Sequence, residues 1–430
     1  MALNSHFLLP NRFRSSFPPI RGVAGVPPIS RSISPQTTPF PLRFSAHAAQ
    51  SSGFPSVSAL SSTATPETSS FTWDDAVRAS QPEYAPGGSS DLSGFFEKIK
   101  FCNRGSEMRF EFVPFVIQEN TVGYIHNRFV EHLKRFEEVF VIKDSSSHGA
   151  QFGYCVTLHD KLGTPEERTA AVGEVIKCLV EEQEDLIPGI RNELYPVTSS
   201  FGGRVYFSLE RAAAPYFGIK AYGIHMNGFV ESGDEKLLWV AKRSLVKPTY
   251  PGMLDHLVAG GLVCDYLFRS ASLLIHSLDQ SKSYYPHYVA ESVHKFSWWQ
   301  FQPHGISCQE NVVKECEEEA GIPQSISVKA LPVGAVSYVD IDGDRFKRDV
   351  LFCYDLKLPE SFVPKNQDGE VEGFNLMPVG SVANIVRRTH FYKPNCSLVV
   401  IDFLFRHGYI YPESLGYLDL LQSLRSGNCS

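Results

Sequence analysis

The chain has 430 residues, of which 43% are hydrophobic and 20% are charged. This length and composition are sufficient for two globular domains and a tail. A formal net charge of -7 at pH 7 argues against the basic surface of a nucleic-acid-binding protein. The sequence has no run of 18 apolar residues, so we expect no membrane span and no membrane partner.

The first 70 residues resemble a targeting leader in composition. They contain five arginines, no lysine and a single acidic residue, Glu67, and they are rich in serine and proline. This composition predicts an organelle transit peptide. Because prolines interrupt any amphipathic helix here, the chloroplast is favoured over the mitochondrion, with the mature protein in the stroma. The alternative is an ordinary disordered tail, and in both cases residues 1–70 lie outside the fold.

The region after the leader is predicted to contain a linker and a smaller α+β companion domain. Residues 71–90 end in proline, glycine and serine, as linkers do. The companion domain is assigned to residues 91–215. Its expected strands cover 108–118, 121–127 and 153–158, and its expected helices cover 130–139 and 165–180. Thr164 and Glu167 have the spacing of a capping box before the second helix.

From residue 216 to residue 430 the pattern predicts a second domain. Strands at 219–231 and 236–244 are expected to pair, and residues 333–359 to form a hairpin about an Asp-Gly turn. Two helices are expected near the end, around 397–408 and 412–425. The nine cysteines include no C-x2-C pair, so neither a zinc motif nor a disulfide framework is predicted.

A short acidic helix is predicted at residues 308–320. Ser307 and Glu310 have capping-box spacing at its start. Gly321 is placed to end it in a left-handed conformation, and Pro323 prevents its continuation. We expect Val313, Cys316 and Ala320 to face the core.

Three glutamates on this helix, Glu315, Glu318 and Glu319, lie three and four residues apart and should form one carboxylate patch. Like charges at these spacings repel, and a hard divalent cation such as Mg2+, or Mn2+, relieves the repulsion. A cation held there can neutralise a diphosphate and assist attack on phosphorus. The three residues are therefore candidate metal ligands and catalytic residues; the alternative is a solvated acidic helix face.

The stretch from Lys314 to Ile322 resembles the R-E-U-x-E-E-x-G-U end of a Nudix box, where U is a bulky aliphatic residue. Residues 210–230 and 250–262 are similar to plant chloroplast Nudix hydrolases related to the Nudix half of fungal thiamine pyrophosphokinase. The resemblance implies an α/β/α sandwich around a mixed sheet. It also implies hydrolysis of a small-molecule diphosphate, such as thiamine diphosphate or its oxidised forms.

Mapped onto the chain, the resemblance implies metal ligands at Glu315, Glu318 and Glu319. A further ligand is expected from a later loop that contains Glu370 and Glu372, and Glu372 is preferred. Gly260 and Gly261 are candidates for the phosphate loop, and Arg243 is a candidate phosphate contact.

Two positions depart from the family pattern. Lys314 replaces the usual arginine, and Ile306 occupies the position of the first glutamate of the box. The identity of the general base therefore stays open.

The glycine loop of the box is interrupted. Counting back from Lys314 puts the box glycine at Gln300, whereas joining Leu262 to Pro303 puts Gly260 there and restores the spacing. Residues 263–302 contain no glycine and no sustained periodicity, so we predict an in-frame retained intron; a genuine surface loop is the alternative.

We expect this insert to separate the glycine pair from the start of the helix, so that the chain turns over slowly and deletion of 263–302 raises activity at least about tenfold. The interruption also leaves open a second function, that of a catalytically impaired Nudix-fold binding protein.

Overall fold

The computed structural model describes residues 71–84, 91–144, 153–262 and 306–427. The expected leader, residues 1–70, and the expected insert, residues 263–302, lie outside the described residues. Residues 68–430 group as a single compact unit. Among the described helices, none combines the length and the apolar character of a bilayer span.

A mixed seven-stranded sheet forms the centre of the second half of the chain. Its main path runs β11-β12-β7-β8-β13, with β10 paired to β7 and β9 paired to β8. The strands are β7 (Lys220–Ser232), β8 (Glu235–Arg243), β9 (Leu254–Asp255), β10 (Val258–Gly261), β11 (Leu331–Asp342), β12 (Arg345–Lys357) and β13 (Val371–Pro378). The β7–β12 pair is parallel and the other pairs are antiparallel.

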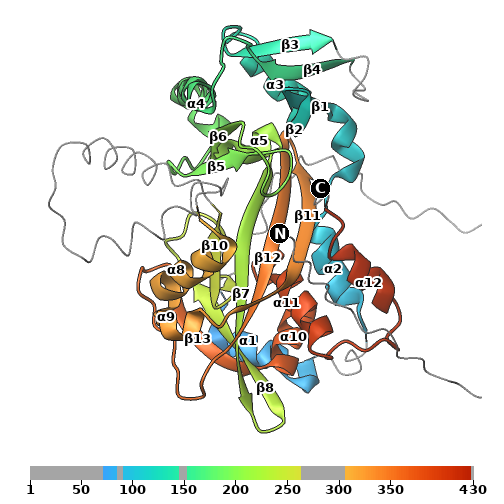
Figure 1. The fold of residues 1–430 in the computed structure, drawn as a ribbon. Helices are drawn as coiled ribbons and strands as arrows, with labels where there is room; N and C mark the ends of the chain where they lie inside the picture. Colours follow the sequence, from blue (N-terminus) through green and yellow to red (C-terminus); the bar gives the residue numbers. More distant parts are fainter. Residues whose placement is uncertain (1–70, 85–90, 145–152, 263–305, 428–430) are drawn as a thin grey trace, which may run out of the picture. The chain divides into compact units, whose positions relative to one another are not determined.

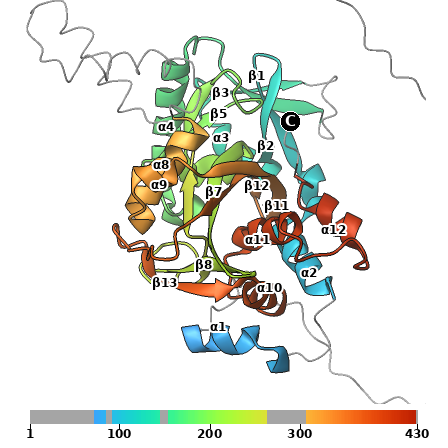
Figure 2. The same cartoon turned by 60° about the horizontal axis from the view of Figure 1, so that its bottom comes forward.

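Helices cover both faces of this sheet, which confirms the expected α/β sandwich (Figure 1). The helices on one face are α8 (Cys308–Ala320) and α9 (Gln324–Ser327). Those on the other are α2 (Ser93–Cys102), α10 (Val379–Arg388), α11 (Pro394–Arg406) and α12 (Tyr417–Ser423), and the turned view in Figure 2 shows the same division. Alternation along β7 places Ile224 and Met226 in the core beneath α8, and Phe229 in the core beneath α11.

The companion region has its own sheet and core. Four strands in the order β2-β1-β4-β3 form its sheet. Its strands are β1 (Phe112–Ile117), β2 (Asn120–His126), β3 (Phe140–Asp144), β4 (Tyr154–Leu158) and the separate pair β5 (Leu194–Val197) and β6 (Phe207–Glu210). Its helices are α3 (Asn127–Leu133), α4 (Pro165–Glu182) and α5 (Ala214–Phe217), with 3-10 turns at Ser106–Glu111, Glu184–Leu186 and Arg211–Ala213.

The local signals in this region are largely confirmed. Thr164 and Glu167 make the expected capping box at the start of α4. The helix expected at 130–139 is shorter, because α3 ends at Leu133 and residues 134–139 turn into β3. The boundary between two domains at residue 215 remains a prediction.

The expected linker at 71–90 is wrong for its first part. Residues Trp73–Ser80 form helix α1, which Thr72 caps with its side chain, and a 3-10 turn follows at Pro82–Tyr84. Ala76 and Ala79 are buried. The prolines and glycines of residues 81–90 indicate a linker. The short amphipathic helix before them was therefore assigned to the linker as well.

Candidate functional site

Helix α8 is fixed at both ends as the sequence predicts. Ser307 Oγ accepts a hydrogen bond from the backbone of Glu310 at 3.1 Å, and the Glu310 carboxylate accepts one from the Ser307 backbone at 3.1 Å. Gly321 ends the helix with a φ of 62°. A helix closed at both ends holds its side chains in a defined direction.

The buried face of α8 differs by one residue from the expectation. Val312, Cys316 and Ala320 are fully buried, whereas Val313 is half-buried. These three positions are four residues apart and so follow one stripe along the helix. This stripe directs Glu315 and Glu319 toward the sheet.

The three glutamates of the expected patch have different environments. The side chain of Glu315 is 15% exposed, whereas that of Glu318 is 50% exposed. Lys314 Nζ lies 3.0 Å from the Glu318 carboxylate and 3.7 Å from that of Glu315. Glu318 therefore lies in solvent with a cationic partner, while Glu315 and Glu319 are drawn into the protein.

Burial dominates the electrostatics of the two inner glutamates. Desolvation raises the pKa of Glu315 to about 7, and the charges of Glu318 and Glu370 add to the effect against the opposing charge of Lys314. Desolvation also raises the pKa of Glu319 well above its ordinary value, with a further contribution from Glu315. Ionising two neighbouring carboxyls in this environment is unfavourable without a counter-charge. A bound divalent cation supplies that charge, so the pair favours cation binding.

Strand β10 lies directly against these carboxyls. The Ala259 backbone N–H donates to Glu319 Oε2 at 2.8 Å. A Cβ atom at Gly260 would come within 2.4 Å of Glu315 Oε1, so only glycine leaves room for the carboxylate. The Asn311 side-chain amide donates to the Gly261 carbonyl at 3.2 Å. Both expected phosphate-loop glycines therefore contact the glutamate helix.

This arrangement contradicts the expectation that the insert separates the glycine pair from the helix. Val258 to Gly261 are held by antiparallel pairing with Gly223 to Met226 of β7. The position of β10 is set by the sheet and does not depend on how many residues link it to α8.

The companion region contributes a residue that the sequence did not indicate. A Cβ atom at Gly261 would lie 3.1 Å from the hydroxyl of Tyr195, which is buried on β5. Helical spacing could have indicated Asn311, which lies one turn before Glu315. No sequence signal links Tyr195 to the glycine pair.

The remaining candidates are differently placed. Glu372 is paired with Lys242, with 3.1 Å between Nζ and Oε2, and its side chain is 45% exposed. Glu370 is paired with Lys247, yet its charge contributes to the raised pKa values of both Glu315 and Glu319. Of the two glutamates on β13 and its approach, Glu370 is therefore electrostatically coupled to the inner pair.

Arg243 is occupied by internal contacts. Its Nη1 lies 2.7 Å from the Asp255 carboxylate, and Nε and Nη2 donate to the carbonyls of Tyr250 and Thr249 at 3.1 and 3.0 Å. These contacts oppose the expectation that its guanidinium meets a substrate phosphate.

Two cavities among the described residues lie away from the carboxyls of the two inner glutamates. One of about 760 Å³ is lined by Phe229, Asp355 and Arg406 among others, and one of about 540 Å³ lies in the companion region near Arg168. Neither is lined by Glu315 or Glu319. The candidate site thus rests on its carboxyl and backbone groups.

Comparison with known proteins gives matches along most of the chain. Residues 94–221 match a family described as a domain of unknown function, DUF4743. Over 368 residues the chain is 56% identical to "Nudix hydrolase 20, chloroplastic" of Arabidopsis thaliana, covering 86% of each chain. It is 53% identical over 371 residues to "Nudix hydrolase 24, chloroplastic" of the same plant, covering 86% of this chain and 88% of the relative. A yeast relative, "Uncharacterized protein YJR142W" of Saccharomyces cerevisiae, is 35% identical over 304 residues, covering 66% of this chain and 73% of the relative.

Proposed function

Because the chain belongs to the Nudix hydrolase family, whose members cleave phosphorus anhydrides, we propose that it is a divalent-metal-dependent hydrolase of a small-molecule diphosphate. The observation that carries the proposal is the pair of half-buried carboxyls, Glu315 and Glu319, facing the glycine strand β10. Carboxylate oxygens are the donors that Mg2+ and Mn2+ prefer, so the donor set fits such an ion.

In this proposal Glu315 and Glu319 hold the ion, and Glu318 on the exposed side supplies a third oxygen ligand. Glu370 replaces Glu372 as the preferred ligand from the later loop, since its charge already acts on the inner pair. When bound, the ion supplies charge neutralisation for the diphosphate.

The chain's own groups orient the site. The Ala259 N–H fixes one oxygen of Glu319, and Asn311 fixes the carbonyl of Gly261. Gly260 leaves room for the carboxylate of Glu315. Holding reacting groups in place in this way removes much of the entropic barrier to attack on phosphorus.

For the substrate we propose thiamine diphosphate or an oxidised form of it, cleaved to the monophosphate. The support is the resemblance of residues 210–230 and 250–262 to plant chloroplast Nudix hydrolases that are related to the Nudix half of fungal thiamine pyrophosphokinase. Phosphate release is assayed on thiamine diphosphate, its oxidised forms and nucleoside diphosphates. The comparison distinguishes a thiamine-type substrate from a nucleotide.

The test of the metal site uses three variants of one helix. We expect Glu315→Gln and Glu319→Gln each to lower metal-stimulated turnover at least about tenfold, because each removes a ligand of the ion. Glu317→Gln is the matched control, since Glu317 is an exposed glutamate of the same helix outside the expected patch. Full metal-dependent activity in either inner variant would refute the site.

The same assay separates the enzyme from the binding-protein alternative. Turnover that requires Mg2+ or Mn2+ on any diphosphate supports the hydrolase. Absence of turnover on the whole panel, together with retained binding of a diphosphate, would identify a binding protein of the Nudix fold instead.

For the location we propose the chloroplast stroma. The support is the composition of residues 1–70 and the word "chloroplastic" in the names of the two plant relatives. A fluorescent protein fused to residues 1–70 should enter plastids, and cytosolic fluorescence would contradict the proposal.

A further inference from the structure

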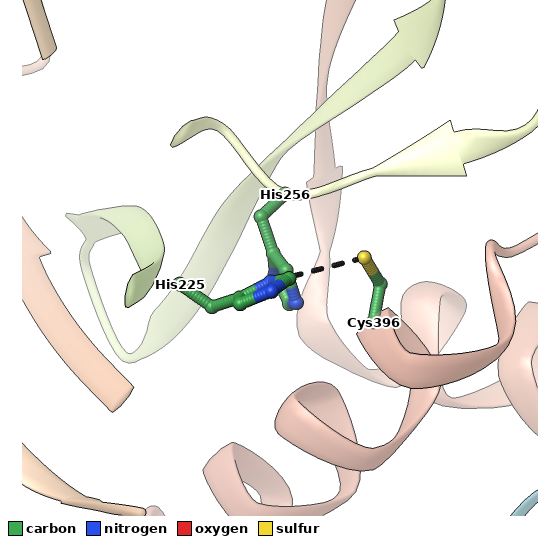
Figure 3. A group of neighbouring side chains, drawn as sticks. All are labelled: His225, His256 and Cys396. Carbon is green, nitrogen blue, oxygen red and sulfur yellow. Dashed lines mark hydrogen bonds between the residues drawn. The ribbon is translucent and has the colours of Figure 1, made fainter. Parts of the chain in front are cut away.

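Three buried metal-ligating side chains meet on the face of the sheet beneath α11. His225 lies on β7, His256 lies between β9 and β10, and Cys396 lies in the first turn of α11. Their ligand atoms are all within 4.8 Å of one another. The two histidines are 5% exposed and Cys396 is fully buried. Figure 3 shows the Cys396 thiol pointing toward the two imidazoles.

The rings of the two histidines lie edge to face beside the thiol. The two imidazoles are nearly perpendicular, at 85°, with their centroids 5.1 Å apart. Cys396 Sγ lies 3.9 Å from Nδ1 of His225 and donates to Asp255 Oδ1 at 2.8 Å.

An independent observation points to a missing ligand. Nε2 of His256 is buried and has no hydrogen-bond partner among the described residues. A buried polar atom without a partner destabilises the folded state, and such atoms are rare unless a bound group satisfies them.

We propose that His225, His256 and Cys396 bind a transition-metal ion of the zinc class. Two imidazoles and one thiolate are soft and borderline donors that favour Zn2+ over Mg2+ or Mn2+. Binding forms a bond from the metal to the Cys396 sulfur and releases the thiol proton to solvent. A water molecule or the Asp255 carboxylate completes four-coordination.

The ligand atoms must approach one another for this. Bonds of about 2.0 to 2.3 Å around a tetrahedral ion place two ligand atoms about 3.4 to 3.8 Å apart. The present separations, up to 4.8 Å, therefore close by roughly 1.4 Å at most, which side-chain rotation provides.

The charges around the three ligands are partly balanced. Arg243 and Lys393 lie 2.7 and 3.5 Å from the Asp255 carboxylate and neutralise it. The thiolate formed at Cys396 offsets one charge of the ion, and the ion replaces Asp255 as the partner of the sulfur. Asp255 keeps its two cations and the backbone N–H of His256 at 2.9 Å.

This site is separate in position and in donor type from the glutamate site. Ile224 and Met226 of β7 pack beneath α8, so alternation directs His225, between them, to the opposite face of the sheet. The cysteine spacing gave no zinc motif because the three ligands come from segments far apart in the sequence.

The test uses the tag-free full-length chain. We expect about one equivalent of Zn2+ in the purified protein by mass spectrometry, and a sulfur-to-metal charge-transfer band when Co2+ replaces it. Cys396→Ser should weaken Zn2+ binding by at least about 10- to 100-fold and abolish the band. Cys102→Ser, a change at another buried cysteine, is the control and should bind normally.

Two further results decide the assignment. Glu319→Gln should retain Zn2+, since its carboxylate belongs to the other site, and this keeps the zinc proposal distinguishable from the failure of the hydrolase proposal. A folded wild-type chain that takes up neither Zn2+ nor Co2+ would overturn the proposal. Equal binding by Cys396→Ser and Cys102→Ser would overturn it as well.

Discussion

At Glu315 the decisive property is a carboxyl held away from water. Its pKa is raised from the ordinary 4.5 to about 7, chiefly by burial. The folded protein therefore binds this proton more tightly than the unfolded chain does, and the contribution of Glu315 to the stability of the metal-free protein falls as the pH rises from about 4.5 to about 7, with no further loss above. Metal must displace the same proton, so metal affinity should rise over this range and then level off.

The corresponding prediction concerns Glu315→Gln. In EDTA, the unfolding free energy of the wild type should fall between pH 5 and pH 8 by about 1 to 3 kcal/mol more than that of Glu315→Gln, because the amide has no proton to lose. Urea unfolding at several pH values measures it. Parallel pH profiles for the two proteins would show that Glu315 ionises normally.

Gly260 gives a second test at the same scale. In Gly260→Ala the new Cβ would meet the Glu315 carboxylate at 2.4 Å, so this side chain must move and metal-stimulated turnover should fall at least about tenfold. Gly373→Ala on β13 is the control, because nothing lies within 4 Å of its added Cβ. Similar kinetics for the two alanine variants would exclude a tight contact between Gly260 and Glu315.

Residue identities were predictable where the signal was local. Glu315 and Glu319 follow from their spacing on one helix. The choice between Glu370 and Glu372 does not, because it depends on how β13 lies against β8, where Lys242 pairs with Glu372. The position of Tyr195 over Gly261 arises from a contact between distant segments and leaves no trace in the sequence.

At the scale of elements, β10 and α8 behave as neighbours independent of the chain between them. The strand is anchored on β7, and Asn311 and Glu319 of the helix bond to it. Deleting residues 263–302 should therefore change the Mn2+ dissociation constant by less than about threefold, within about 0.6 kcal/mol. This prediction replaces the tenfold gain in activity that we expected from the sequence. That gain assumed that the insert separates the glycine pair from the helix, whereas β10 and α8 are in contact.

Equilibrium titration of Mn2+ into the full chain and the deletion variant makes the comparison. A dissociation constant lower by tenfold or more after deletion would mean that residues 263–302 disturb the glutamates despite the pairing of β10 with β7.

Elements with explicit end signals were predicted well. The capping boxes of α4 and α8 and the Asp-Gly turn between β11 and β12 are short-range patterns. Helix α1 was missed although it has its own capping box, because only eight residues precede a stretch of proline and glycine. The order of strands in the mixed sheet depends on long-range pairing and was not predicted, since the family resemblance implied only a mixed sheet between helices.

At the scale of the whole molecule, α1 and the residues beside it pack against α10 and the segment that follows it. The Phe71 ring stacks on that of Phe391, with centroids 4.1 Å apart. Asn384 donates to the Ser80 carbonyl at 2.7 Å, and Arg388 donates to the carbonyls of Ala79 and Gln81 at 3.1 and 2.8 Å. A chain that begins at residue 91 loses these contacts.

We expect the free energy of unfolding of a chain that begins at residue 91 to be about 2 to 4 kcal/mol lower than that of a chain that begins at residue 68. The shorter chain loses apolar burial and leaves polar groups on α10 unpaired. Urea unfolding of the two chains measures the difference. Equal midpoints and slopes would mean that α1 contributes nothing to the stability of the sheet and its helices.

The docking of α1 also sets a limit on maturation. If residues 1–70 are removed as the proposed import leader, the cut must fall before Phe71, since a cut within α1 would leave Phe391 without its ring partner and the α10 donors without their acceptors. On that proposal, the tertiary contact with residues 384–391 limits where the mature N-terminus can lie. The proposed processing then depends on folding, because the new N-terminus would dock only after α10 and the segment up to Phe391 have formed.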